Sequence, residues 1–298
     1  MYSLSKKSGK LIACDADGTN IYLNENSFDN STDNQPFDLI DDRMIRNLVP
    51  RKVSPYDIKY LRESIKKREP PNVEYLVKPY YHLLSVFEES NQKEIKNLNN
   101  CMVAPGKKRN RFYIAGSSGC GKSTFIYNYA KIFLRQNPDF KVIVFSDVEP
   151  SQDIVLSKLN PIRITLNDQI VTEPIEPHEI ANSFCIFDDV DSIQNKKIRQ
   201  AVEALSDSCF HQGSTKANIE LCVSRHASSD HKATRASLIN ANYFTYYPAS
   251  KVGLSYTLAK FGLNKEQIQK AVNLPSRYCI LHTQTPQYII YQSGVYLL

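Results

Sequence analysis

Apolar runs alternate with longer amphipathic stretches from residue 111 onward, which predicts strands separated by helices. The predicted strands are Phe112–Ala115, Val142–Phe145, Ile162–Leu166, Phe184–Phe187 and Ile219–Val223. Helices are predicted at Ser123–Gln136 and Ile193–Ser206. This alternation is typical of an α/β domain with a mainly parallel, doubly wound sheet.

The first hundred residues follow a different pattern and predict a small α+β region. Two short apolar runs flank the turn-forming segment 15–18, so a hairpin is expected there. Ser54 and Pro55 suit the cap and the first position of a helix, with Asp57 in its first turn. The apolar face of this helix is Ile58, Leu61 and Ile65, and a second helix carries Leu76, Tyr80, Leu83, Leu84 and Phe87.

The end of the chain predicts a helical and β-hairpin extension. Two short helices are expected at Val252–Phe261 and Lys265–Val272, followed by a hairpin of Tyr278–Leu281 and Tyr288–Tyr291. The polar, basic segment 91–110 suggests a domain boundary. The chain is therefore expected to divide into an accessory region at 1–105, a core at 106–250 and an extension at 251–298.

A phosphate-binding loop (P-loop) is the most specific motif in the chain. The pattern G-x-x-x-x-G-K-[ST] lies between a predicted strand and a predicted helix, as such a loop requires. Its backbone amides and the helix N-terminus favour anions, Lys122 can neutralise the β- and γ-phosphates, and Ser123 can ligate Mg²⁺. The predicted nucleotide-binding residues are Gly116, Ser117, Ser118, Gly119, Cys120, Gly121, Lys122, Ser123 and Thr124.

A second candidate site is the acidic pair Asp188-Asp189, which ends the predicted strand Phe184–Phe187. Two carboxylates at a strand end are the expected partner of a P-loop, since one can hold Mg²⁺ and the other can activate water. Asp188 is therefore predicted as a metal ligand, and Asp189 as the catalytic base. The pair could instead be an ordinary capped strand end, with Asp191 and Ser192 capping the helix that follows.

Composition bears on the partners and the cellular compartment expected for this chain. The net charge of +6 permits contact with nucleic acid without requiring it. The seven cysteines contain no C-x-x-C pair, which indicates a reducing compartment. The histidines and cysteines do not show the spacing of metal ligands, so no zinc site is predicted. No leader sequence or membrane-length apolar run is visible, so an intracellular protein without membrane contact is expected. The aromatic cluster Tyr243, Phe244, Tyr246 and Tyr247 favours a core position over base stacking.

The P-loop, the segment Ile186–Val190 and the segment Thr234–Asn242 together resemble the poxvirus-type genome-packaging ATPases of large DNA viruses, which belong to the FtsK–HerA superfamily. The resemblance covers roughly residues 110–250. It implies a RecA-like core in which ATP hydrolysis, with Mg²⁺, moves double-stranded DNA. It also implies a homo-oligomeric ring, capsid or other virion partners, and a location in the host cytoplasm, a viral factory or the virion.

The resemblance also implies a polar sensor within Ser224-Arg225-His226 and an arginine that reaches the γ-phosphate. Family members often carry that arginine ahead of the sensor strand, but residues 209–218 contain none. Arg235 is the preferred replacement as a catalytic residue, and Arg225 is the second choice.

Two other functions stay open at this level. The chain could be another viral P-loop ATPase, such as a helicase or replication motor, which single-stranded DNA would stimulate. It could also be a virion-assembly protein that uses ATP as a switch, although a catalytic carboxylate at Asp189 argues against pure binding.

Overall fold

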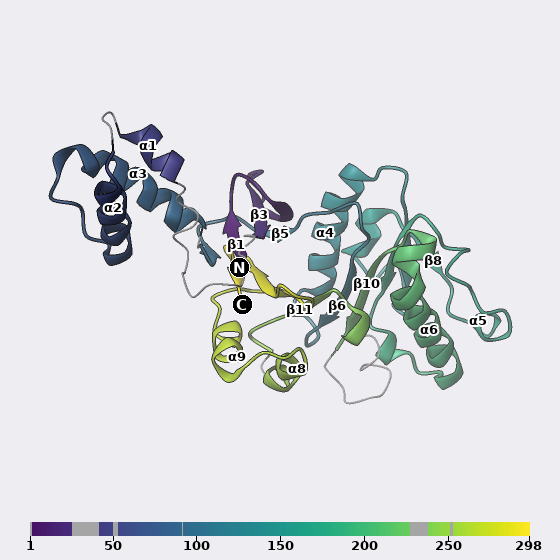
Figure 1. Ribbon diagram of the computed structural model, residues 1–298. Helices are drawn as coiled ribbons and strands as arrows, with labels where there is room; N and C mark the ends of the chain where they lie inside the picture. The colour runs from purple at the N-terminus through teal and green to yellow at the C-terminus, as the bar shows by residue number, and fades with distance from the viewer. Residues whose placement is uncertain (1, 26–41, 50–52, 91, 227–237, 251–252) are drawn as a thin grey trace. The chain divides into compact units, whose positions relative to one another are not determined.

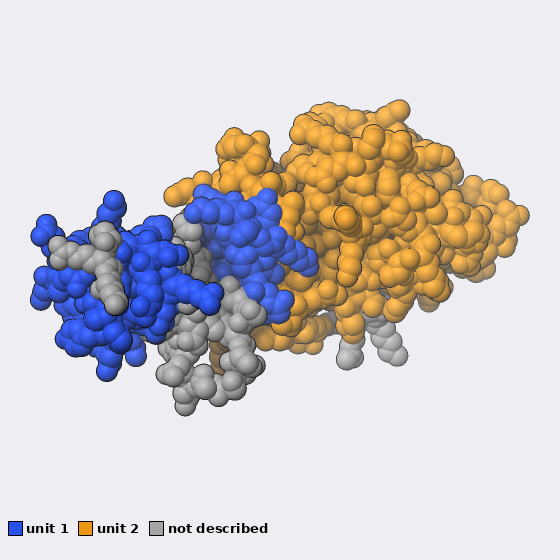
Figure 2. Space-filling model, turned by 45° about the horizontal axis from the view of Figure 1, so that its top comes forward, with its two compact units in different colours: residues 1–10, 21–95 blue, residues 11–20, 96–298 orange. Residues whose placement is uncertain are grey.

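The computed structural model describes residues 2–25, 42–49, 53–90, 92–226, 238–250 and 253–298. The chain forms two compact units, one made of residues 1–10 and 21–95, the other of residues 11–20 and 96–298 (Figures 1 and 2). The predicted α/β fold with a mainly parallel sheet is confirmed, as are the N-terminal α+β region and the C-terminal helices and hairpin. The three-part division at residues 105 and 250 stays a prediction.

In the first unit, the described residues include an antiparallel strand pair and three helices. β1 (Tyr2–Ser5) pairs antiparallel with β3 (Asn20–Glu25), and β4 (Glu94–Ile95) follows the helices. The helices are α1 (Asp42–Leu48), α2 (Pro55–Lys67) and α3 (Glu74–Ser90). Ser54 and Asp57 form the predicted capping box at the start of α2. Of the predicted apolar faces, Ile58, Leu61, Ile65, Leu76, Tyr80 and Leu83 are buried in one core with Ile45, and Leu84 is half-buried against it. The Phe87 side chain lies outside the described part of the structure.

The second unit is built on one large sheet. Its spatial order is β14, β13, β12, β11, β6, β10, β9, β7, β8. The parallel strands are β6 (Arg111–Ala115), β7 (Lys141–Phe145), β8 (Ile162–Ile164), β9 (Ser183–Phe187), β10 (Glu220–Arg225) and β11 (Tyr243–Tyr246). The antiparallel strands are β12 (Cys279–His282), β13 (Tyr288–Tyr291) and β14 (Gly294–Leu297). Outside this large sheet, β2 (Lys10–Cys14) pairs antiparallel with β5 (Met102–Val103).

Helices cover both faces of this sheet (Figure 1). On one face Tyr129 of α4 (Lys122–Gln136) packs on the Phe112 ring at 4.6 Å. On the other face Val202 of α6 (Lys196–Ser208) lies in the same buried cluster as Tyr113, the next residue of β6. Successive residues of a strand point to opposite faces, so the central strands β6 and β9 are apolar along most of their length. The predicted aromatic cluster at residues 243–247 is buried as core.

Several elements differ from the sequence-based expectation. The helix predicted from Ile193 begins at Lys196, because Asn195 accepts hydrogen bonds from the Lys197 and Ile198 amides and caps it. Residues 190–192 form a short 3-10 turn instead. A π-helical stretch at Cys209–Ala217, the short helix α5 (Gln169–Thr172) and the strand β14 were not predicted. The short C-terminal helices are α8 (Leu254–Lys260) and α9 (Lys265–Val272), and β12 pairs with β13 as the predicted hairpin.

Candidate active site

The P-loop connects β6 to α4 at the carboxyl end of the parallel strands, where α/β proteins bind their ligands. Gly119 and Gly121 have φ values of 74° and 108°, a region that residues with a Cβ rarely adopt. Gly116 is required for space instead. A Cβ there would lie 2.5 Å from Cys120 Sγ and 2.7 Å from Tyr247 Cδ2. Ser117 and Ser118 are exposed, so the rim of the loop is open to solvent.

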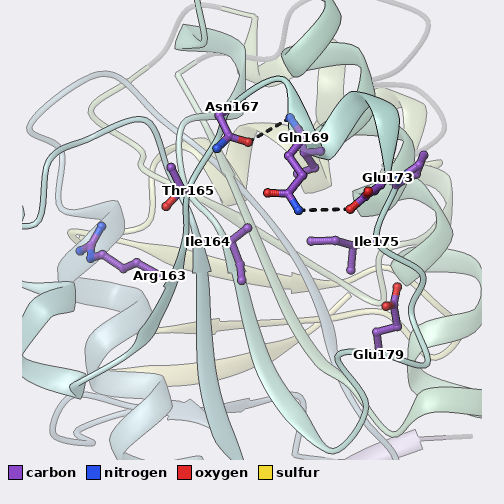
Figure 3. A pocket seen from close by; sticks show the side chains of 10 residues that line it. Arg163, Ile164, Thr165, Asn167, Gln169, Glu173, Ile175 and Glu179 are labelled. Carbon is purple, nitrogen blue, oxygen red and sulfur yellow. Dashed lines mark hydrogen bonds between the residues drawn. The ribbon is translucent and has the colours of Figure 1, made fainter.

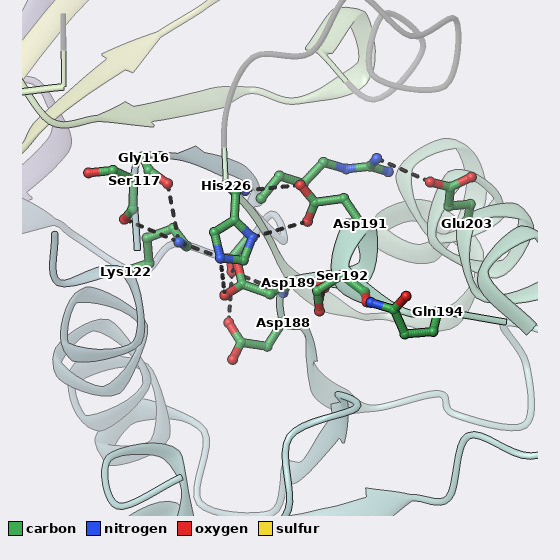
Figure 4. Close-up of polar contacts among 12 residues, drawn as sticks. Gly116, Ser117, Lys122, Asp188, Asp189, Asp191, Ser192, Gln194, Glu203 and His226 are labelled. Atoms are coloured by element: carbon green, nitrogen blue, oxygen red, sulfur yellow. Dashed lines mark hydrogen bonds and ion pairs between the residues drawn. The ribbon is translucent and has the colours of Figure 1, made fainter. Parts of the chain in front are cut away.

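The Lys122 side chain folds back over the loop and is buried. Its ammonium donates to the carbonyl oxygens of Gly116 at 3.2 Å and Ser117 at 3.4 Å (Figure 4). It also lies 3.3 Å from Asp189 Oδ1. Lys122 and Asp189, which lie 67 positions apart in the sequence, are therefore in direct contact.

Asp188 and Asp189 follow β9 and differ sharply in environment. Asp188 is buried, and its amide donates to the Phe145 carbonyl at the end of β7. Burial raises the pKa of Asp188 to about 6, although a hydrogen bond from Ser224 acts to lower it. Asp189 has a positive φ of 47°, which is uncommon for any residue other than glycine. This left-handed turn directs the second carboxylate toward Lys122.

Ser224, at the end of β10, lies between the two carboxylates. Its hydroxyl is 2.7 Å from Asp188 Oδ1 and 3.2 Å from Asp189 Oδ1, and it accepts a hydrogen bond from the Asp189 amide. A hydroxyl has one proton, so it donates to one carboxylate at a time. β10 lies between β6, which leads into the P-loop, and β9, which leads into the carboxylates. Ser224 therefore occupies the position expected for the polar sensor residue.

His226 also faces the carboxylates. Its Nε2 lies 3.5 Å from Asp189 Oδ2, and its Nδ1 lies 3.6 Å from Asp191 Oδ1. Ligand atoms of Asp189, Asp191 and His226 lie within 4.8 Å of one another, close enough to share a cation. The expected sensor segment thus contributes two of its three residues to the site.

Arg225, the remaining residue of that segment, points elsewhere. Its side chain is 3% exposed, and Nη1 lies 3.3 Å from Glu203 Oε1 of α6. A guanidinium held in this way cannot reach a neighbouring subunit, so the structure argues against Arg225 as the catalytic arginine. Arg235 lies outside the described residues, and its role stays a prediction.

The oxygen ligands at this site fit a magnesium ion. The Ser123 hydroxyl and the Asp188 carboxylate are hard donors of the kind that Mg²⁺ prefers. A divalent cation beside Asp188 would also offset the desolvation that raises the pKa of this carboxyl.

Three residues beside the P-loop were not predicted as part of the site. The Tyr247 ring packs against Gly116, and Ser250 Oγ lies 3.0 Å from Ser117 Oγ. The Arg277 guanidinium lies next to Gly121. All three come from segments more than 100 positions later in the chain, so no local pattern could have indicated them.

A separate cavity of about 550 Å³ lies between β8 and α5 (Figure 3). Its polar groups bond to one another or to nearby protein: Gln169 donates to Glu173 at 3.1 Å, and Arg163 pairs with Asp153. None of the predicted nucleotide-binding or catalytic residues lines it.

Comparison with known proteins gives one clear relative. No model of a known protein family matches the chain. The uncharacterized protein V3 of Sputnik virophage is 32% identical over 220 residues, which are 68% of this chain and 86% of V3. This chain belongs to the V3 family.

Solved structures give weaker similarities. The genome packaging NTPase B204 of Sulfolobus turreted icosahedral virus 2, in complex with sulfate, matches with a TM-score of 0.40 and 12% identity, over 64% of this chain and 96% of B204. The pCW3 conjugation coupling protein TcpA, with ATPγS, matches with a TM-score of 0.42 and 10% identity, over 69% of this chain and 66% of TcpA. Among the described helices, none has the length and apolar character needed to cross a membrane.

Proposed function

We propose that this member of the V3 family is a P-loop ATPase. The observation that carries the proposal is the contact between Lys122 of the loop and Asp189 at the end of β9, 3.3 Å apart. A phosphate-binding loop alone would support nucleotide binding, whereas a carboxylate beside its lysine supports hydrolysis.

Each residue then has a distinct task. The amides of residues 116–124 and the Lys122 ammonium hold the β- and γ-phosphates. Ser123 and Asp188 hold Mg²⁺, which when bound neutralises charge on the phosphates. Asp189 orients the attacking water and accepts its proton. Ser224 and His226 fix the position of the Asp189 carboxylate through the contacts described above.

We further propose that hydrolysis drives the translocation of double-stranded DNA, and that the chain packages a viral genome as a poxvirus-type member of the FtsK–HerA superfamily. Support comes from the motifs at residues 116–124, 186–190 and 234–242 and from the viral source of the relative V3. The net charge of +6 is compatible with a DNA partner. The proposal includes a homo-oligomeric ring, contact with capsid or other virion proteins, and action in an infected host cell, with Arg235 reaching a neighbouring site.

The test is the rate of ATP hydrolysis with no DNA, with single-stranded DNA and with double-stranded DNA, each at two salt concentrations. Stimulation by double strands that weakens as salt rises supports the proposal, because phosphate contacts release counterions. Preferential stimulation by single strands would indicate a helicase, and slow turnover indifferent to DNA in an assembled ring would indicate a nucleotide switch. Lys122→Ala is the control, since it should lose the nucleotide itself.

A further inference from the structure

Arg277 lies beside Gly121 of the P-loop. It precedes β12, in the loop that follows α9. A Cβ placed on Gly121 would lie 3.4 Å from Arg277 Nη2, 3.6 Å from Nε and 3.7 Å from Cζ. These nearly equal distances mean that the guanidinium lies alongside Gly121 rather than touching it with one end.

The neighbours of Arg277 are held firmly. The Ser276 hydroxyl accepts a hydrogen bond from the Gln292 amide at 2.9 Å and donates to the Tyr278 carbonyl at 2.5 Å. The Tyr278 ring packs edge-on against Phe125, in the first turns of α4, and its hydroxyl donates to the Cys101 carbonyl. The backbone on both sides of Arg277 is therefore fixed relative to the loop, so the side chain needs little ordering to act there.

The charge of Arg277 is not balanced within the described part of the chain. The side chain is exposed, and neither a carboxylate nor a hydrogen-bond acceptor is recorded beside it among those residues. Arg163 and Arg225, by contrast, each pair with a carboxylate. Lys122 is also neutralised, by Asp189. The unbalanced cation thus sits beside loop amides and a helix N-terminus that themselves attract anions.

The strand order indicates which end of a nucleotide this cation meets. Ala115, Tyr246 and Cys279 form one row across β6, β11 and β12, so Arg277 lies just beyond the same sheet edge as the P-loop. Asp188 and Asp189 follow β9, which lies two strands from β6 in the opposite direction. The carboxylates and Lys122 mark the γ-phosphate end, which leaves the α-phosphate end for Arg277.

We propose that Arg277 binds the α- and β-phosphates of the nucleotide from within the same subunit, an inference that rests on the proposed ATPase function. A guanidinium is always charged and offers paired donors that match phosphate oxygens. In this role Arg277 strengthens binding of diphosphate and triphosphate alike, and it does not select for the γ-phosphate. It is a nucleotide-binding residue distinct from the arginine expected to act on the γ-phosphate.

The test compares Arg277→Ala with wild type by calorimetric titration of the full chain with ADP, ATP and inorganic triphosphate, with Mg²⁺ present. We expect all three dissociation constants to rise by about tenfold or more, the cost of a lost charge-assisted contact. In turnover assays the loss should appear in KM more than in kcat, and Arg277→Lys should restore part of the affinity. Arg135→Ala removes an exposed arginine from the last turn of α4 and serves as the matched control.

Three results would overturn the inference. Unchanged ADP affinity would show that Arg277 does not touch the shared phosphates. A fall in kcat with unchanged affinity would assign it to the γ-phosphate. Weaker ATP binding with unaltered triphosphate binding would assign it to the nucleoside. Failure of wild type and Lys122→Ala alike to bind any nucleotide would overturn the proposed function itself, whereas normal wild-type binding with an unaffected Arg277→Ala refutes the role of Arg277 alone.

Discussion

Lys122 Nζ and Asp189 Oδ1 lie 3.3 Å apart, so the cation of the P-loop and the carboxylate opposite it neutralise each other. Both side chains are largely shielded from solvent, with exposed fractions of 5% and 21%. An incoming triphosphate must therefore exchange this ion pair for contacts between Lys122 and phosphate oxygens. Under the proposed function, the pair competes with nucleotide binding and holds the Asp189 carboxylate next to the phosphate-binding loop.

Asp189→Asn is expected to separate these two effects. Without the competing negative charge, nucleotide affinity should stay equal to wild type or rise, while hydrolysis should fall by about 10²-fold or more because the base is lost. Equilibrium titration with ADP and single-turnover hydrolysis measure the two quantities. Asp139→Asn, in the exposed turn after α4, is the matched control. Wild-type turnover by Asp189→Asn would remove Asp189 from its assigned role.

Gly116→Ala is expected to damage the loop through lack of space. The new methyl group would lie 2.5 Å from Cys120 Sγ and 2.7 Å from the buried Tyr247 ring. Because the Tyr247 ring is buried and cannot give way, the loop must move at a cost of roughly 1–3 kcal/mol. Weaker ADP binding and a lower melting temperature should follow. Gly106→Ala is the control, since nothing lies within 4 Å of a Cβ there and its φ is ordinary. Equal behaviour of the two variants would contradict the packing described.

Arg225→Ala is expected to reduce stability. Its buried guanidinium pairs with Glu203, so removal loses both packing and the ion pair. We expect the free energy of unfolding in urea to fall by roughly 1–3 kcal/mol. Glu203→Ala should also lower stability, because it leaves the buried Arg225 guanidinium without its counter-charge. An Arg225→Ala protein as stable as wild type but unable to hydrolyse ATP would instead restore Arg225 as a candidate catalytic arginine.

Glu220 gives a prediction about pH. This buried carboxyl accepts hydrogen bonds from Tyr129 and the Asn110 amide, yet burial raises its pKa from 4.5 to about 7. The folded protein thus holds a proton that the unfolded chain releases at lower pH. The contribution of Glu220 to stability is present below pH 4.5 and is lost as pH rises toward 7.

Glu220→Gln cannot titrate and should lack this decline. The measurement is urea unfolding of both proteins between pH 4.5 and 7.5. The quantity compared is the free energy of unfolding of wild type minus that of Glu220→Gln. This difference should fall by roughly 1–3 kcal/mol across the range. The hydrogen bond that glutamine loses adds a nearly constant offset, so the slope decides. A flat or rising difference would show that burial does not control this group.

The sequence predicted individual elements and motifs, whose signals lie within short stretches of the chain. The P-loop, its strand and its helix were placed to within one residue, because glycine spacing and periodicity are short-range signals. The strand before Asp188 was equally visible. The order of strands in the sheet was not, since it depends on which distant segments pair.

Residues that complete the site show the same limit. Tyr247, Ser250 and Arg277 carry no motif, and they matter only because β11 and β12 place them beside the loop. The start of α6 was also misplaced. Asp191 and Ser192 resembled a helix cap, but the Asn195 side chain caps the helix, which begins at the next residue. The sequence correctly indicated a capped helix in this segment, but it placed the first residue of the helix three positions too early.

The position of β6 within the sheet has a consequence during synthesis. Both of its hydrogen-bonded neighbours, β10 and β11, lie more than 100 residues later in the chain. At ribosomal rates of about 5–20 residues per second, this strand waits at least several seconds for its partners. During that interval the apolar segment Phe112–Ala115 must be shielded by chaperones or by transient collapse. The strand that leads into the P-loop gains both of its neighbours only after Tyr246 has been synthesised.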